Sequence, residues 1–236
     1  MTSVRLYCIP HAGATSSVYR SWPDQLPPGV EVVGLDPPGR GAKARERPAA
    51  DYSTLVEALA SQVIADLERT GCPAYATFGH SFGAMLALAV AARAAETTGT
   101  APAGAVLSAS LPPRLLPVPD ELATLGDEEL LAKMAADGGT APELLSSGAM
   151  AGYLLRLLRQ DLTIRPEFRE HASLRVDFPL VLVAAQEDAY VPPEQMWAWA
   201  EHSTASVRCV EIPGGHFAVL QRPREALAPL FREVVC

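Results

Sequence analysis

The sequence predicts an α/β fold in which a mainly parallel sheet is flanked by helices. Two observations predict it: short runs alternate with longer stretches at helical spacing, and the short runs are almost continuously apolar. Strands of that kind are covered by helices on both faces, which is typical of parallel sheets. Six strands are expected, at residues 4–9, 30–35, 74–78, 103–110, 179–185 and 206–212.

Four helices are expected to connect or follow these strands. They occupy residues 53–70, 82–96, 193–201 and 224–235. Pro223 stands just before the last of them, where proline suits the start of a helix. Crossover helices of this length are what parallel neighbouring strands require.

One region interrupts the alternation. Residues 111–177 contain a proline-rich exit, LPPRLLPVPDEL, and then two amphipathic segments, GDEELLAKMAADGG and AMAGYLLRLLRQDL. Acidic residues open the first segment and glycines close it, as expected of a helix. Two interpretations stay open: the segments simply pack on the core, or they form a lid over a pocket.

Length and charge favour one domain that binds neither nucleic acid nor membrane. The chain has 236 residues, 49% of them hydrophobic, which is enough for a single domain with a sizeable core. A formal net charge of −8 gives no general attraction to nucleic acid or to an anionic membrane surface. No apolar run approaches the ~20 residues of a membrane-spanning helix.

Cysteine usage points to a reducing compartment. Cys8, Cys72, Cys209 and Cys236 are scattered, without the spacing of a zinc site. The first residues, MTSVRLYCIPHAG, lack the pattern of a signal peptide. We therefore expect a reduced, cytoplasmic protein without a metal site.

The stretch FGHSFGA places Ser81 between two glycines, after an apolar strand and before an alanine-rich helix. A serine at such a strand-to-helix turn needs small neighbours, because the backbone there is strained and crowded. The N-terminus of the following helix favours developing negative charge. Ser81 is therefore predicted to be a nucleophile, not merely a small residue in a turn.

A serine nucleophile requires a base and a carboxylate that orients the base. His216 follows the last predicted strand in PGGHFAVLQRP, and Asp188 follows the fifth in QEDAYVPPEQ. The carboxyl ends of parallel strands are where α/β sheets place their sites. The order Ser81, Asp188, His216 is the nucleophile, acid and base order of α/β-hydrolases. Glu187 is the alternative acid.

Three other histidines are assigned no catalytic role. His80 neighbours Ser81 in sequence, but consecutive side chains point apart, so we expect it to pack beneath the turn. His171 falls in the interrupting region and His202 ends a predicted surface helix, so both are expected to be solvated.

An acyl-transfer intermediate needs two hydrogen-bond donors for its oxyanion. The backbone N–H of Phe82, just after the nucleophile, is predicted to be one. The small-residue loop PHAGA follows the first strand, and we predict Ala12 as the second donor. The alternative for this loop is a simple strand exit.

Together these motifs resemble the stand-alone type II thioesterases that serve polyketide synthases and nonribosomal peptide synthetases. The matching pieces, in chain order, are LYCIPHAGATSSVYRSW, PPGRG, FGHSFGAMLA, LGDEELLAKM, EDAYVPPE and GGHF. They span nearly the whole chain. The resemblance implies an α/β-hydrolase fold over residues 1–236, with a helical lid at about 111–177.

The resemblance also implies hydrolysis of acyl thioesters on the phosphopantetheine arm of an acyl or peptidyl carrier protein. It gives Ser81 as the nucleophile, His216 as general base and then acid, and Asp188 as the group that orients the imidazole. Ala12 and Phe82 would donate to the oxyanion. No metal or redox cofactor is implied, and a monomer is expected.

Two further sets of residues are predicted from composition. Candidates for the pocket-facing side of the lid are Leu144, Leu145, Met150, Leu154 and Leu158. Such a pocket would separate acyl groups that differ by one methylene by only about 1–3 kcal/mol, as suits a broad editor. Candidates for docking a carrier protein, typically acidic, are Arg40, Lys43, Arg45 and Arg47.

Other functions fit the same residues. A carboxylesterase or lipase would use the same triad on oxygen esters. An acyltransferase or cyclase would pass the acyl group to an alcohol or amine. A catalytically silent interaction protein with this fold is the non-enzymatic alternative, although it would have no need for all three triad residues.

Overall fold

The sheet is fully parallel, and the direction in which its strands are added reverses once along the chain. The computed structural model describes residues 4–234. The six strands are β1 (Val4–Ile9), β2 (Val30–Gly34), β3 (Ala74–His80), β4 (Gly104–Ser108), β5 (Leu180–Ala185) and β6 (Val207–Ile212). Their order is β2-β1-β3-β4-β5-β6, and every neighbouring pair is parallel. The direction of winding reverses between β1 and β3, which is where open α/β sheets bind ligands.

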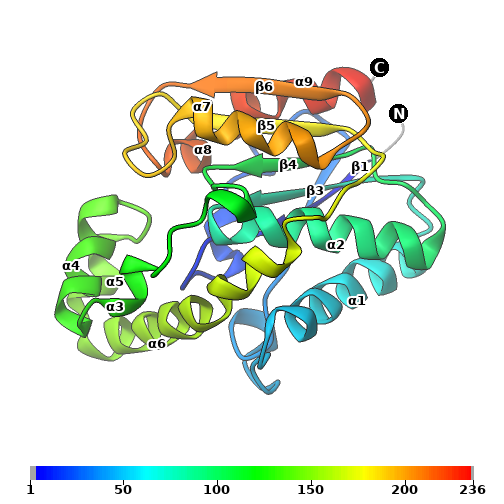
Figure 1. Cartoon of the computed structure of the whole chain (residues 1–236). Helices are drawn as coiled ribbons and strands as arrows, with labels where there is room; N and C mark the ends of the chain where they lie inside the picture. The colour runs from blue at the N-terminus through cyan, green and yellow to red at the C-terminus, as the bar shows by residue number, and fades with distance from the viewer. Residues whose placement is uncertain (1–3, 235–236) are drawn as a thin grey trace.

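Helices cover both faces, as the apolar strands require (Figure 1). One face packs against α1 (Tyr52–Thr70), α2 (Phe82–Thr98), α7 (Pro193–Met196) and the 3-10 helix η5 (Trp197–His202). The other packs against η1 (Ser16–Tyr19), α8 (Ala218–Gln221) and α9 (Pro223–Val234). The strand side chains are divided between two apolar layers, with Tyr7 and Ile9 in one and Leu6 and Cys8 in the other.

Residues 111–177, hereafter the insertion, form a group of helices at the carboxyl edge of the sheet (Figure 1). They are η3 (Pro113–Leu115), α3 (Glu121–Thr124), α4 (Asp127–Asp137), α5 (Pro142–Ser146), α6 (Gly148–Ile164) and η4 (Arg165–His171). The two predicted amphipathic segments are α4 and α6. The short α3 and α5 were not expected, because four or five residues are too few to show a periodicity.

The predicted strands and three of the four predicted helices are confirmed with small changes at their ends, whereas the helix predicted over 193–201 is the short α7 followed by the 3-10 helix η5. β3 continues to His80, because Gly79 and His80 pair with Leu107 and Ser108 of β4. β4 stops at Ser108, because Ala109 has a φ of 51°, which no strand accommodates. The predicted end of the last helix at residue 235, like Cys236, lies outside the described residues.

One prediction about the surface is wrong. His202 is fully buried, and its Nδ1 lies 2.8 Å from the carbonyl oxygen of Leu174. The carbonyl belongs to the chain leaving the insertion, so the sequence near His202 gave no sign of it. Within residues 4–234, none of the helices combines the length and the apolar character needed to cross a membrane.

Candidate active site

Ser81 occupies a strained turn between β3 and α2. Its φ of 54° and ψ of −117° lie in a region that side chains rarely adopt, and its backbone N–H donates to the carbonyl oxygen of Ser108 at 2.8 Å. A Cβ added at Gly79 would lie 1.9 Å from the carbonyl oxygen of Gly83. A Cβ at Gly83 would lie 2.4 Å from that of Ile9. Only glycine fits at both positions, so the sequence pattern around Ser81 reflects backbone packed against backbone.

Asp188 and His216 form a hydrogen-bonded pair on adjacent loops. His216 Nδ1 lies 2.8 Å from Asp188 Oδ2, and the loops follow β5 and β6, which are neighbours in the sheet. The other carboxylate oxygen accepts the backbone N–H groups of Tyr190 at 2.8 Å and Val191 at 3.1 Å. Three bonds therefore hold a buried carboxylate against one imidazole nitrogen. The alternative acid, Glu187, is exposed to solvent.

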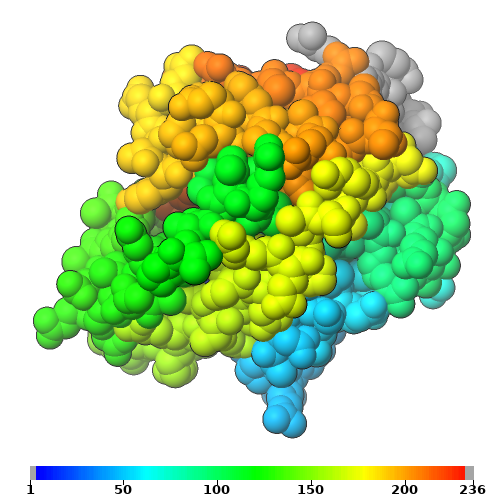
Figure 2. Space-filling model, in the orientation of Figure 1, coloured from blue at the N-terminus to red at the C-terminus, as the bar shows by residue number. Residues whose placement is uncertain are grey.

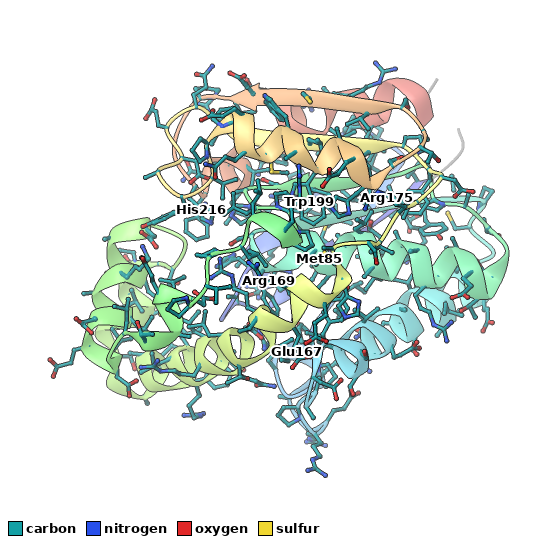
Figure 3. The ribbon with its side chains drawn as sticks, viewed as in Figure 1. Met85, Glu167, Arg169, Arg175, Trp199 and His216 are labelled. Carbon is teal, nitrogen blue, oxygen red and sulfur yellow. The ribbon has the colours of Figure 1, made fainter. Side chains whose placement is uncertain are left out.

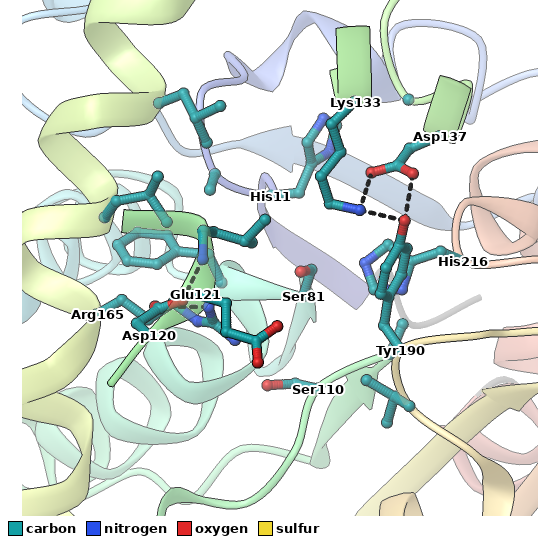
Figure 4. Close-up of a pocket in the computed structure, with 18 of the residues that line it drawn as sticks. His11, Ser81, Ser110, Asp120, Glu121, Lys133, Asp137, Arg165, Tyr190 and His216 are labelled. Atoms are coloured by element: carbon teal, nitrogen blue, oxygen red, sulfur yellow. Dashed lines mark hydrogen bonds and ion pairs between the residues drawn. The ribbon is translucent and has the colours of Figure 1, made fainter. Parts of the chain in front are cut away.

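Ser81, His216, Ala12 and Phe82 line one cavity. Figure 4 shows Ser81 and His216 in it. Phe82 is the first residue of α2, so its N–H belongs to the unpaired donors of a helix N-terminus. Ala12 lies in the loop after β1, next to β3 in the sheet. His216 stands at the edge of the sheet facing the insertion, whereas Met85 and Trp199 lie within the packed core (Figure 3). The residues predicted as nucleophile, base and oxyanion donors are thus brought together.

The cavity has a volume of about 560 Å³ and a mainly apolar wall. Phe82 of α2 lines the cavity from the sheet side. The insertion supplies apolar side chains from α3, α4, α6, η4 and the link between α3 and α4, namely Leu122, Leu125, Leu130, Met134, Leu158, Leu162 and Phe168. Lys133, Asp137 and Tyr190 add polar groups on the His216 side (Figure 4). A hollow is visible between the helices of the insertion and the loop after β5 (Figure 2). Such a cavity suits an apolar acyl chain.

Two further histidines, His11 and His80, lie near His216, and burial keeps them neutral. Burial, and secondly the charge of His216, lower the pKa of His11 to about 3. Burial also lowers the pKa of His80 well below its ordinary value, and His80 Nδ1 lies 3.3 Å from Ser108 Oγ. The prediction that His80 packs beneath the turn is confirmed. His11 lines the cavity and was missed by sequence reasoning, although it directly precedes Ala12 in PHAGA.

The prediction of the pocket-facing residues of the insertion is mostly wrong. Leu158 lines the cavity, but Leu144 and Met150 are exposed, while Leu145 and Leu154 lie outside the cavity wall. The physical reason is that α3, α4 and the second half of α6 form the wall. Helix α5 and the start of α6 lie beyond it.

The prediction of Arg40 as a docking residue is also wrong. Arg40 is only 1% exposed, and its guanidinium forms a bidentate ion pair with Asp161 of α6, at 2.7 and 2.5 Å. Lys43 is half-buried and pairs with Glu46, while Arg45 and Arg47 are exposed. No cluster of three or more His, Cys, Asp or Glu side chains suited to a metal ion occurs in the described part of the chain.

Comparison with known proteins identifies the family of this chain. The family model described as thioesterase domain matches residues 4–233. A probable cadicidin biosynthesis thioesterase of Streptomyces griseus is 30% identical over 219 residues, which cover 93% of this chain but only 59% of that protein. Thioesterase PikA5 of Streptomyces venezuelae is 30% identical over 220 residues, covering 92% of this chain and 75% of that protein.

Solved structures agree. The RedJ thioesterase of the prodiginine biosynthetic pathway in Streptomyces coelicolor superposes with a TM-score of 0.82 at 33% identity, covering 98% of this chain and 90% of that one. The type II thioesterase BorB of the borrelidin biosynthetic cluster superposes with a TM-score of 0.81 at 28% identity, covering 98% and 93%. The chain therefore belongs to the thioesterase family and has the α/β-hydrolase fold.

Proposed function

We propose that this thioesterase hydrolyses acyl groups from the phosphopantetheine arm of acyl or peptidyl carrier proteins, as a type II editing or release enzyme of polyketide or nonribosomal peptide biosynthesis. The observation that carries the proposal is that Ser81 and His216 line one apolar cavity and that His216 is hydrogen-bonded to Asp188. The relatives named for biosynthetic pathways support the substrate class.

The geometry suggests the following steps. Ser81 Oγ attacks the thioester carbonyl while His216 Nε2 takes its proton, since Nδ1 is occupied by Asp188. The N–H groups of Phe82 and Ala12 hold the oxyanion, each typically worth about 3 kcal/mol in the transition state. The intermediate collapses, and the thiolate leaves as a thiol with the proton from His216. His216 then deprotonates a water molecule, which attacks the acyl-enzyme and releases the carboxylic acid and Ser81.

The partner and the setting belong to the same proposal. The carrier protein brings the phosphopantetheine, and the reaction uses no metal or redox cofactor. The insertion acts as a lid over the acyl group. Arg45 and Arg47, with Lys43, stay the predicted surface for the carrier, and the enzyme is proposed to be monomeric and cytoplasmic.

The test is single-turnover release of acyl groups of several lengths from a purified acyl carrier protein. Wild type should release them rapidly, and Ser81→Ala should lose up to about a million-fold in rate. Ser61→Ala, on the exposed side of α1, is the matched control and should behave as wild type. Mass spectrometry should find the acyl group on Ser81.

Each alternative predicts a different result. Intact carrier thioesters with rapid cleavage of matched oxygen esters would indicate an esterase. Capture of the acyl group by an added alcohol or amine in preference to water would indicate a transferase or cyclase. If neither ester is cleaved by a folded protein, the catalytic proposal is wrong.

A further inference from the structure

The loop that carries Ala12 is tied to helix α6 of the insertion. The backbone N–H of Gly13 donates to Asp161 Oδ2 at 2.8 Å, and Asp161 is only 1% exposed. Leu158, one turn earlier on α6, lies against the same residue: a Cβ added at Gly13 would lie 3.0 Å from Leu158 Cβ. One face of α6 thus meets the chain directly beside Ala12.

The Gly13 N–H that donates to Asp161 belongs to the central peptide of a tight turn. Ala14 N–H donates to the carbonyl oxygen of His11 at 3.1 Å, which closes a four-residue turn with Ala12 and Gly13 at its centre. The φ of Gly13 is +76°, the value required at the third position of a type II turn. Type I and type II turns differ by a flip of this central peptide. By accepting the Gly13 N–H, Asp161 selects one of the two orientations.

Arg40 holds the Asp161 carboxylate in place. Its Nη1 donates to Asp161 Oδ2 at 2.7 Å and to the carbonyl oxygen of Ala14 at 3.3 Å, and its Nη2 donates to Asp161 Oδ1 at 2.5 Å. Both side chains are almost fully buried. A buried bidentate pair has one well-defined geometry, and each partner alone would be an uncompensated charge.

We infer that Asp161 and Arg40 are positioning residues that orient the turn presenting the Ala12 N–H to the oxyanion, and so make the oxyanion site depend on the seating of helix α6. The inference rests on the proposed role of Ala12 as a donor. Neither side chain lines the cavity, so both act through the turn.

The test separates transition-state stabilisation from substrate binding. Hydrolysis of a small acyl N-acetylcysteamine thioester by Asp161→Asn should show kcat lowered by roughly 10- to 100-fold with KM unchanged, because a displaced donor is lost mainly in the transition state. An acyl trifluoromethyl ketone, which forms an oxyanion on the serine, should bind more weakly by the same factor. The matching thioether, which has no carbonyl, should bind as tightly as to wild type.

Two further variants distinguish positioning from stability. Asp161→Leu combined with Arg40→Met replaces the pair by apolar side chains, which often preserves stability, yet leaves the Gly13 N–H without its acceptor. This double variant should stay cooperatively folded and still show the reduced kcat. Asp127→Asn, which breaks the exposed ion pair between α4 and Arg159 of α6, should retain wild-type kcat.

A stably folded double variant with wild-type kcat would overturn the inference, as would equal weakening of the ketone and the thioether. These outcomes differ from failure of the proposed function. If wild type cleaves the small thioester but ignores carrier proteins, the substrate class is wrong and the positioning test still applies. If wild type cleaves nothing, the proposed function fails, and the affinities for the ketone and the thioether alone decide the role of Asp161.

Discussion

Contacts between main-chain atoms exclude any side chain at Gly79 and Gly83, which lie two residues before and after Ser81. Side chains can change rotamer to make room for an added methyl group, but backbone in a central strand or at a helix start cannot. At Gly79 the obstructing atoms belong to Gly83 and Ala84, and at Gly83 they belong to Ile9 and Pro10. A substitution at either position therefore acts on the position of Ser81 itself, because the serine lies between them.

Gly79→Ala should destabilise the protein strongly and displace Ser81, the proposed nucleophile. We expect the free energy of unfolding to fall by about 3 kcal/mol or more, as for other overpacked core sites, and any folded fraction to have little thioesterase activity. Urea unfolding and the hydrolysis rate measure both effects.

Gly152→Ala on α6 is the matched control for that substitution. Apart from its chain neighbours and the nearby backbone of α6, no atom lies within 4 Å of the Cβ it would add, so the change should stabilise the protein by up to about 1 kcal/mol through helix propensity. Wild-type stability and activity in Gly79→Ala would show that the turn tolerates a side chain.

At the scale of elements, Tyr190 joins helix α4 of the insertion to the loop after β5. The Tyr190 hydroxyl donates to Asp137 Oδ1 at 2.5 Å and accepts a hydrogen bond from Lys133, both on α4. The Lys133 Nζ also lies 3.9 Å from the centre of the tyrosine ring. The same residue donates its backbone N–H to Asp188, and its ring lies 5.3 Å from that of His216. Helix α4 is thus held to the loop whose Asp188 is hydrogen-bonded to His216.

Tyr190→Phe should loosen α4 and leave the loop after β5 in place. The change removes the hydroxyl but not the backbone bond to Asp188, so the cost is roughly 1 kcal/mol of hydrogen bonding to α4. Amide hydrogen exchange in α4 should accelerate by up to about tenfold, while exchange in α6 stays the same. Tyr153→Phe on α6, outside the cavity wall, should change neither. Unchanged exchange in α4 would mean that other contacts hold the helix.

For the molecule as a whole, buried neutral histidines make stability depend on pH. Burial lowers the pKa of His11 to about 3, that of His80 well below its ordinary value, and that of His202 as well. In the unfolded chain these imidazoles titrate near 6.5, so below that pH the unfolded state binds more protons than the folded state. The stabilisation is complete above about pH 6.5 and is lost as the pH falls.

The free energy of unfolding should therefore decrease between pH 6.5 and pH 5. Each histidine whose folded pKa lies below this window contributes a slope of up to about 1.4 kcal/mol per pH unit. Urea unfolding at several pH values measures the slope, and His80→Gln should reduce it. A slope that is the same in His80→Gln and in wild type would show that His80 is not kept neutral.

The sequence predicted the strands and the triad candidates better than the surfaces and the cavity wall. β1 to β6 were recognisable because both faces are buried, which leaves continuous apolar runs. Asp188 and His216 were recognisable because strand ends in a parallel sheet meet at one edge. The burial of Arg40 was not, because its partner Asp161 is 121 residues away. The cavity wall depends on how α3 and α4 pack, which is a tertiary property that a local pattern does not contain.

The order of the proposed triad residues along the chain has a consequence for synthesis. Ser81 directly follows β3, whereas Asp188 and His216 follow β5 and β6, in the last quarter of the chain. Chains emerge and fold from the N-terminus. A growing polypeptide on the ribosome therefore contains Ser81 long before it contains Asp188 and His216, so the proposed nucleophile lacks its proposed base until the loop after β6 has been made.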